Sequence, residues 1–223
     1  MDRRTFSRLT TTSLASAAGA AAVGVPTLAL LGPGQAVAQV AGLREGTDFL
    51  RLPQPAPVEA PAGQVEVVEF FAYSCVHCFN FEPMFEDWIQ KKPAHVTVRR
   101  TPVAFNAGFE PMQRLYYTLE ALNLVGDLHA KVFKAIHVDR QRLTTADAIT
   151  AWVVKQGVDQ KRFTDMYNSF GVVGKARRAT TLQDAYRVEG TPALGIAGRY
   201  YVPGQAARTL LVANALIAEA RKG

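Results

Sequence analysis

Two cysteines, Cys75 and Cys78, lie close together in the stretch F-F-A-Y-S-C-V-H-C-F-N-F-E-P at positions 70–83. Thiols at this spacing can form a disulfide, supply half of a metal site, or act as a redox pair. A structural zinc site needs four ligands, but the chain has no third cysteine. Apart from His77, which lies between the two cysteines, its histidines lie in other predicted elements. A four-residue disulfide loop removes only about 2 kcal/mol of chain entropy, so the pair would be a weak structural staple.

The redox interpretation agrees better with the local pattern. An apolar strand predicted at 64–72 leads into a helix predicted at 76–91, which places Cys75 at the helix N-terminus. Free N–H groups and the helix dipole stabilise a thiolate there and lower its pKa. Cys78 follows one turn later and is expected to be more buried. We therefore predict Cys75 as the attacking sulfur and Cys78 as the resolving one.

His77 lies between the two cysteines. An imidazole beside Cys75 can offer a hydrogen bond or a positive charge to its thiolate. Stabilising the thiolate favours the reduced form, which makes the disulfide form a stronger oxidant. His77 therefore predicts a pair that donates disulfides.

The secondary structure predicted around this pair changes along the chain, from strands to a run of helices and back to strands. A lead-in segment rich in Pro, Ala and Gly covers 39–63, and a second strand is predicted at 95–101. Two further strands with a turn at Ala197-Gly198 and a final helix are predicted at 192–196, 199–202 and 206–221. Between them, helices are predicted at 110–122, 127–138, 145–156, 160–169 and 174–186, with breaks at Gly126, Gly157 and Gly171. The order predicts an α/β fold in which one mixed sheet is interrupted by an all-helical block.

The N-terminus has the parts of a secretory signal peptide. A basic stretch at 1–8 and an apolar run at 14–31 precede Ala36-Val37-Ala38, small residues that suit a cleavage site. A membrane anchor is the alternative, but eighteen residues is near the lower limit for spanning, and the run contains glycines and a proline. We therefore predict a signal peptide at 1–38 and an exported, periplasmic protein.

The export route stays open at this level. Arg3-Arg4-Thr5-Phe6 resembles a twin-arginine signal, but paired arginines also occur in ordinary signal peptides. Removing residues 1–38 takes away three arginines and one aspartate, which lowers the formal net charge from +6 to +4. The basic residues are scattered, so we expect no nucleic-acid partner, and we expect a monomer.

The cysteine segment resembles the active site of the DsbA-type thiol:disulfide oxidoreductases, and Gly190-Thr191-Pro192-Ala193 resembles the cis-proline loop of that family. The resemblance covers nearly all of 45–221 and implies a thioredoxin-like mixed sheet with an inserted helical subdomain. The thioredoxin-like part would comprise 39–105 and 187–223, and the insertion 106–186. By this resemblance, Pro192 faces Cys75, and Thr191 and Val76 lie at the substrate-binding surface. Val76 departs from the family, in which proline is common at this position, so the strength of the oxidant stays open.

The family also carries a buried acid that helps to move protons, and Glu69 matches it, six residues before Cys75. Alternation places Glu69 on one side of its strand with Val65, Val67 and Phe71. The corresponding side of the next strand makes Arg100 its candidate partner, where the family usually has a lysine.

The resemblance implies a dithiol oxidase that transfers its Cys75–Cys78 disulfide to cysteines of newly exported polypeptides. A membrane quinone-linked partner of the DsbB type would reoxidise it. The disulfide is itself the redox group, so no bound cofactor and no metal are expected. The alternatives are a thiol reductase or isomerase of the same fold, and a polypeptide-binding holdase whose cysteines are incidental.

Overall fold

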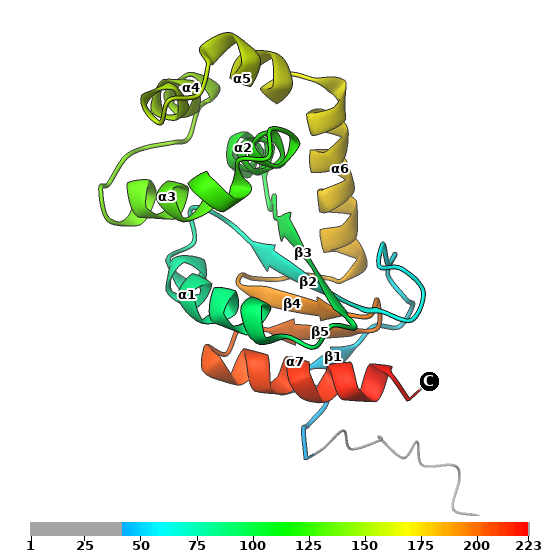
Figure 1. Cartoon of the computed structure of the whole chain (residues 1–223). Helices are drawn as coiled ribbons and strands as arrows, with labels where there is room; N and C mark the ends of the chain where they lie inside the picture. Colours follow the sequence, from blue (N-terminus) through cyan, green and yellow to red (C-terminus); the bar gives the residue numbers. More distant parts are fainter. Residues whose placement is uncertain (1–41, 223) are drawn as a thin grey trace, which may run out of the picture. The chain divides into compact units, whose positions relative to one another are not determined.

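The computed structural model describes residues 42–222 (Figure 1). The predicted signal peptide at 1–38 lies outside these residues. The elements of the sheet and of the two helices that accompany it are β1 (Leu50–Arg51), β2 (Val65–Phe71), α1 (Val76–Lys91), β3 (Val96–Pro102), β4 (Ala193–Ile196), β5 (Tyr200–Pro203) and α7 (Ala207–Ala220). The elements between β3 and β4 are the short 3-10 helix η1 (Ala107–Phe109), α2 (Glu110–Ala121), α3 (Val125–His137), α4 (Ala146–Lys155), α5 (Gln160–Tyr167) and α6 (Phe170–Ala185).

The five strands form one mixed sheet in the order β1-β5-β4-β2-β3, which confirms the predicted fold class. β2 and β3 are parallel, and the other neighbouring pairs are antiparallel. β2 is an inner strand of the sheet, because it lies between β3 and β4. Its register places Glu69 opposite Arg100 on β3 and opposite Leu194 on β4.

Helices cover both faces of the sheet (Figure 1). α1 and α7 pack on one face, where Val67, Leu194 and Phe85 belong to one buried apolar cluster with residues of α7. The C-terminal part of α6 packs on the other face, where Tyr186 contacts Phe70 with ring centroids 5.1 Å apart. β2 is buried along its whole length, as its almost uninterrupted apolar sequence predicts.

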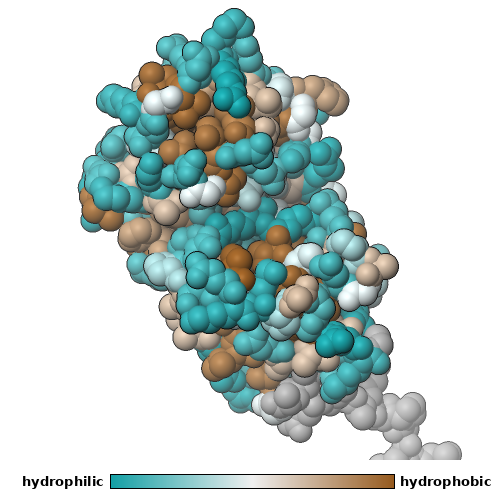
Figure 2. Space-filling model, in the orientation of Figure 1, coloured by the Kyte–Doolittle hydropathy of each residue, from teal (hydrophilic) through white to brown (hydrophobic). Residues whose placement is uncertain are grey.

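The helices α2 to α6 build a separate apolar cluster above the end of β2, in which Leu115, Phe133, Ile149 and Phe163 are buried. Phe71 and Cys78 from the sheet half belong to the same cluster, so the block covers the end of β2 that leads to the cysteines. In Figure 2, hydrophobic surface gathers over the region of α2 and α4, with hydrophilic residues around it.

Two helix boundaries differ from the prediction. Gly126 and Gly171 were expected to separate helices, but each is the second residue of one, in α3 and α6. Glycine destabilises the interior of a helix more than its first turn, because the first N–H groups have no intrahelical partner and this turn is the least constrained. A glycine at the second position is therefore tolerated. Ser169 caps α6 by accepting a hydrogen bond from Val172 N at 3.2 Å, so α6 starts four residues before the expected Gly174.

The lead-in segment contains a strand that its sequence does not indicate. Leu50 and Arg51 pair with Tyr201 and Tyr200 and extend the sheet beyond β5. A two-residue strand is too short to show an alternating pattern in the sequence. Leu50 and Arg51 are a strand only because they pair with β5. Within residues 42–222, no helix is long and apolar enough to cross a membrane.

Candidate active site

Cys75 is the N-cap of α1, in the connection that follows β2. Its backbone is extended (φ −85°, ψ 115°), and its sulfur accepts a hydrogen bond from Cys78 N at 3.3 Å. Cys75 N donates to Ala72 O at 3.0 Å, which holds the connection against the strand end. The sulfur therefore lies at the positive end of the helix, where a thiolate is stabilised.

Cys78 has a different environment, although it lies only three residues further on. It is 1% exposed and packs in the apolar cluster with Phe71 and Tyr73, whereas Cys75 is half-buried. Both cysteines are free thiols, so the structure describes the reduced pair. An incoming sulfur can reach Cys75 but not Cys78.

The loop before β4 brings Thr191 and Pro192 to the cysteines. The Thr191–Pro192 peptide bond is cis, and Cys75 Sγ lies 3.3 Å from Thr191 O, to which it donates when it is protonated. Sheet register causes this proximity, because Phe70 near the end of β2 pairs with Ala193, the residue after the proline. A contact across 116 residues of sequence therefore follows from the pairing of two neighbouring strands.

The environment of Cys75 lowers its pKa to about 5. The hydrogen bond from the Cys78 thiol is the largest cause, and burial opposes it. The Thr191 side chain and the backbone N–H groups of Cys78 and His77 lower the pKa of Cys75 further. Burial raises the pKa of Cys78 far above its ordinary value, and its hydrogen bond to Cys75 adds to this. At neutral pH the reduced pair is therefore a thiolate at Cys75 and a thiol at Cys78.

His77 and Val76 are exposed at the start of α1. His77 lowers the pKa of Cys75 through its backbone N–H, which any residue except proline would supply. An effect of its imidazole on the potential stays a prediction. Val76 is 50% exposed beside Cys75, so its side chain is free to contact a bound molecule.

A groove with a cavity volume of about 670 Å³ opens beside the cysteines. It is formed by the cis-proline loop, the first turns of α1, the loop before α7 and the segment before β1. Thr191, Pro192 and His77 line it together with apolar side chains such as Phe81 and Met84. Extended backbone groups next to a reactive sulfur suit the binding of an extended polypeptide.

Glu69 and Arg100 meet beneath the cysteines. Arg100 Nε lies 3.1 Å from Glu69 Oε2, and the Glu69 side chain is only 1% exposed. The parallel register of β2 and β3 places the two residues directly opposite each other. Glu69 Oε2 nevertheless has no hydrogen-bond partner, so the two groups are close without a well-aligned hydrogen bond.

Sequence reasoning missed Glu82 and Glu86, which share this arginine. Arg100 Nη2 lies 2.9 Å from Glu82 Oε1 and 2.7 Å from Glu86 Oε1. A signal was present, because Glu82 lies four residues after Cys78 and therefore on the same face of the helix. A charged residue at a buried helix position predicts a buried ionic partner.

His129 and Tyr73 extend the network into the helical block. His129 Nε2 lies 3.3 Å from Glu82 Oε1, and Tyr73 Oη lies 2.8 Å from His129 Nδ1. Burial lowers the pKa of His129, against the effect of Glu82, so the imidazole is neutral at pH 7. A neutral ring protonated at Nε2 accepts a hydrogen bond from Tyr73 Oη, and its Nε2 lies near Glu82 without a well-aligned hydrogen bond.

The three carboxylates differ in how they share the Arg100 charge. Burial raises the pKa of Glu69 to about 8, although the Arg100 charge opposes this rise. Burial would also raise the pKa of Glu82, but the neighbouring His129 and the Arg100 charge lower it overall. One guanidinium cannot neutralise three carboxylates, so the most buried one keeps its proton. Glu69 is thus a protonated acid near neutral pH, with a pKa suited to proton exchange.

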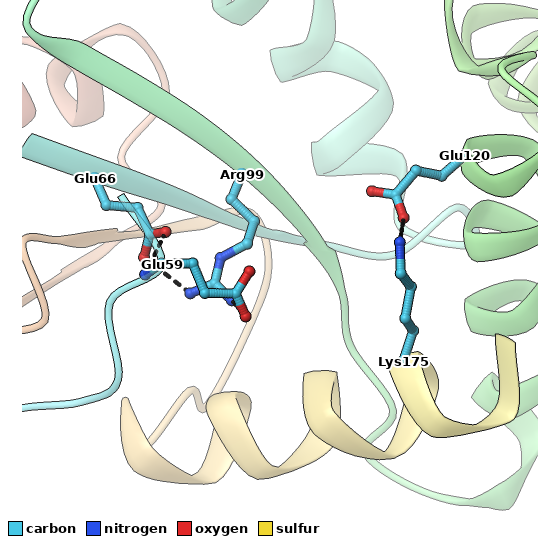
Figure 3. A network of polar contacts seen from close by, with 5 residues as sticks. All are labelled: Glu59, Glu66, Arg99, Glu120 and Lys175. Carbon is cyan, nitrogen blue, oxygen red and sulfur yellow. Dashed lines mark hydrogen bonds and ion pairs between the residues drawn. The ribbon is translucent and has the colours of Figure 1, made fainter. Parts of the chain in front are cut away.

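The neighbouring Arg99 lies on the other face of the sheet, in a second network (Figure 3). It donates to Glu66 at 2.8 Å and pairs with Glu59, also at 2.8 Å, and Lys175 of α6 pairs with Glu120 of α2 beside them. Neither network is placed to bind a metal, because residues 42–222 contain no group of three or more His, Cys, Asp or Glu side chains arranged for one.

Comparisons with known proteins agree with this geometry. The family model described as "DSBA-like thioredoxin domain" matches residues 101–214. The chain is 43% identical over 179 residues to the thiol:disulfide interchange protein DsbA of Bordetella parapertussis, which covers 78% of this chain and 85% of that protein. It is 35% identical over 188 residues to DsbA of Pseudomonas aeruginosa PAO1, covering 82% of this chain and 89% of that protein.

The structure is similar to the crystal structure of Pseudomonas aeruginosa DsbA, with a TM-score of 0.77 and 34% sequence identity. The match covers 81% of this chain and 96% of that one. The predicted resemblance is therefore confirmed by sequence and by structure, including the thioredoxin fold with its helical insertion. The chain belongs to the DsbA family of thiol:disulfide interchange proteins, and it is a thiol:disulfide oxidoreductase.

Proposed function

We propose that this oxidoreductase donates its Cys75–Cys78 disulfide to cysteines of polypeptides exported to the periplasm. The observation that carries the direction of transfer is the position of the Cys75 sulfur at the N-terminus of α1, where it accepts a hydrogen bond from Cys78 N and where its pKa is lowered to about 5. A stabilised thiolate favours the reduced pair, so the disulfide form is a strong oxidant. The same property favours an oxidase over a reductase or isomerase of this fold.

The reaction proceeds in two exchange steps. A substrate thiolate attacks Cys75 Sγ, forms a mixed disulfide and breaks the Cys75–Cys78 bond, and the released Cys78 thiolate takes up a proton. A second substrate thiolate then attacks the substrate sulfur of the mixed disulfide, and Cys75 leaves as a thiolate. Two electrons pass from the substrate to the protein, and the substrate gains a disulfide. The low pKa of Cys75 makes it a good leaving group.

Glu69 is proposed to supply the proton that Cys78 needs. Its raised pKa keeps it protonated near pH 7, and it lies on the strand that leads to the cysteines. Arg100 cannot give up its own proton, so its role is to hold the charge balance around Glu69. Transfer between Glu69 and Cys78 would run through water.

The groove beside Thr191 and Pro192 is proposed to bind the substrate polypeptide as an extended segment, with Val76 and His77 at its edge. Reoxidation of the dithiol requires an electron acceptor, for which we propose a membrane quinone-linked partner of the DsbB type. Residues 1–38 are proposed to be the signal peptide that directs export.

Equilibration of the purified protein with glutathione buffers tests the direction of transfer. We expect the pair to stay reduced in buffers that oxidise thioredoxin, because its disulfide is the stronger oxidant. A reduction potential as low as that of thioredoxin would contradict the proposal. Cys75→Ser should abolish the oxidation of a peptide dithiol. A holdase with incidental cysteines would show no such oxidation in the wild type, and its polypeptide-binding activity would survive in Cys75→Ser.

A further inference from the structure

One wall of the substrate groove comes from the segment before β1, far from the cysteines in sequence. The groove is lined by Gly46, Thr47, Phe49 and Leu50 together with residues of α1. Leu50 is 45% exposed, so this wall presents apolar surface to a bound molecule. The segment has little regular structure of its own, because β1 comprises only Leu50 and Arg51.

Asp48 fastens this wall, and it is buried although it lies between the groove residues Thr47 and Phe49. Its carboxylate accepts hydrogen bonds from Arg44 N at 2.9 Å and from Arg208 Nε and Nη2 at 3.0 and 2.7 Å. Its backbone carbonyl accepts from Gln205 Nε2 at 3.0 Å. The hydrogen bond from Arg44 N, followed by the one from Arg208, lowers the pKa of Asp48.

The loop that Asp48 holds is the loop before α7, and it contacts the cis-proline directly. A Cβ added to Gly204 would lie 2.4 Å from Pro192 O, so the two backbones pack without room for a side chain. Ala206 has φ 51° and ψ −132°, a conformation that residues with a side chain rarely adopt. Gln205 N donates to Thr209 Oγ1 at 2.7 Å and helps to hold this turn.

These contacts join two walls of the groove. The segment that contains Thr47 and Leu50 is bonded through Asp48 to Arg208 and to the loop before α7. This loop in turn contacts Pro192 through Gly204. Neither Asp48 nor Arg208 lines the groove or contacts a cysteine. Their effect on exchange must therefore act through the position of the wall.

We propose that Asp48 and Arg208 are positioning residues that set the substrate preference of the groove. They hold the segment 44–50 in place, so that Leu50 lines the same groove as Phe81 and Met84. The groove then favours polypeptides that carry an apolar side chain near the reacting cysteine over small thiols, which need only Cys75. This inference rests on the proposed function and names the substrate class of the same site.

The test compares two substrates of the oxidised protein. Asp48→Ala should raise KM for a cysteine peptide with an adjacent leucine about fivefold, with kcat little changed, because the wall is no longer held in place. The rate with dithiothreitol, which does not occupy the groove, should stay the same. Arg208→Met should act in the same direction, and Arg208→Lys should restore part of the affinity.

The matched control is Asp165→Ala, which removes an exposed ion pair with Lys161 on α5, outside the groove. It should change neither the KM and kcat for the peptide nor the rate with dithiothreitol. Unchanged peptide kinetics in Asp48→Ala, or an equal loss with peptide and dithiothreitol, would overturn the inference. If Asp48→Ala does not fold, the Arg208 variants decide, because that side chain is 51% exposed. Failure of the wild-type protein to oxidise the peptide would instead contradict the proposed function.

Discussion

Arg99 and Arg100 are adjacent on β3 and point to opposite faces of the sheet. The Arg100 side chain is 9% exposed and lies among Glu69, Glu82 and Glu86 beneath α1. The Arg99 side chain is 24% exposed and pairs with Glu66 and Glu59 on the face near α6 (Figure 3). Two residues of the same type on one strand thus build two different networks.

The difference lies in the number of carboxylates that each arginine must satisfy and in their access to water. On the Arg99 face, Glu59 is 68% exposed, and water can share the charge. On the Arg100 face, three carboxylates share one guanidinium, and the most buried of them holds a proton. The same kind of ion pair is therefore structural on one face and is proposed to be part of the proton chemistry on the other.

Replacing the arginines one at a time tests this comparison most strongly. Arg100→Met should lower the free energy of unfolding by about 3 kcal/mol at pH 7, because it leaves buried carboxylates without a partner. Arg99→Met should cost less, about 1 kcal/mol, since water reaches Glu59 and the buried Glu66 keeps its hydrogen bond from Glu59 N. Urea unfolding of the oxidised protein measures both values. The cost of Arg100→Met should fall at pH 5, as more of the carboxylates are protonated, and equal costs at pH 7 would contradict the comparison.

Neutralising one glutamate on each face separates the two networks kinetically. Glu69→Gln should slow the step in which Cys78 gains or loses its proton by about 100-fold, a usual effect of removing a general acid or base. Stopped-flow measurement of peptide oxidation gives this rate. Glu66→Gln on the other face is the control and should leave it unchanged.

The Glu69 pKa also predicts a pH dependence of stability. The folded pKa, about 8, is higher than that of an exposed carboxyl, so the folded state binds this proton more tightly. The contribution of Glu69 to stability is therefore fully present below about pH 4.5 and is lost as the pH rises to about 8. Glu69→Gln should remove this slope from the unfolding free energies measured between pH 5 and 8. A slope that persists in the variant would assign it to another group.

The pKa of Cys75 should be insensitive to the Arg99 network. The rate of alkylation of the reduced protein by iodoacetamide should rise with a midpoint near pH 5 in the wild type and in Arg99→Met. His77→Ser should move the midpoint by less than about one unit, because its backbone N–H remains. A larger shift would show that the imidazole contributes. The reduced protein should also gain stability relative to the oxidised one as the pH rises from 5 to 9, because its folded state keeps the thiolate.

The smallest effect is expected for Lys175→Met on the outer face. Its ion pair with Glu120 is exposed, and such pairs contribute about 0.5 kcal/mol. Thermal unfolding at low and high salt should show little difference between this variant and the wild type. A loss comparable to that of Arg100→Met would remove the distinction between the two faces.

Much of the site can be predicted from local sequence. The position of Cys75 at a helix N-terminus follows from an apolar strand next to an amphipathic helix, and alternation along β2 and β3 suggests Glu69 and Arg100 as neighbours. Glu82 and His129 were missed because the sequence of a helix does not show which residue of another helix lies beside a charged side chain. The starts of α3 and α6 were missed because a glycine in a first turn resembles a helix end.

The sequence by itself determined the chemistry, because reactive types at short spacing, Cys75, His77 and Cys78, lie within a strand-to-helix transition. Only the tertiary structure decided which groups surround the cysteines. β4 brings Thr191 to Cys75, α3 brings His129 to Glu82, and Asp48 ties the groove wall to the loop before α7. These contacts join residues far apart in the chain, and their pKa values depend on burial, which pairing and packing create.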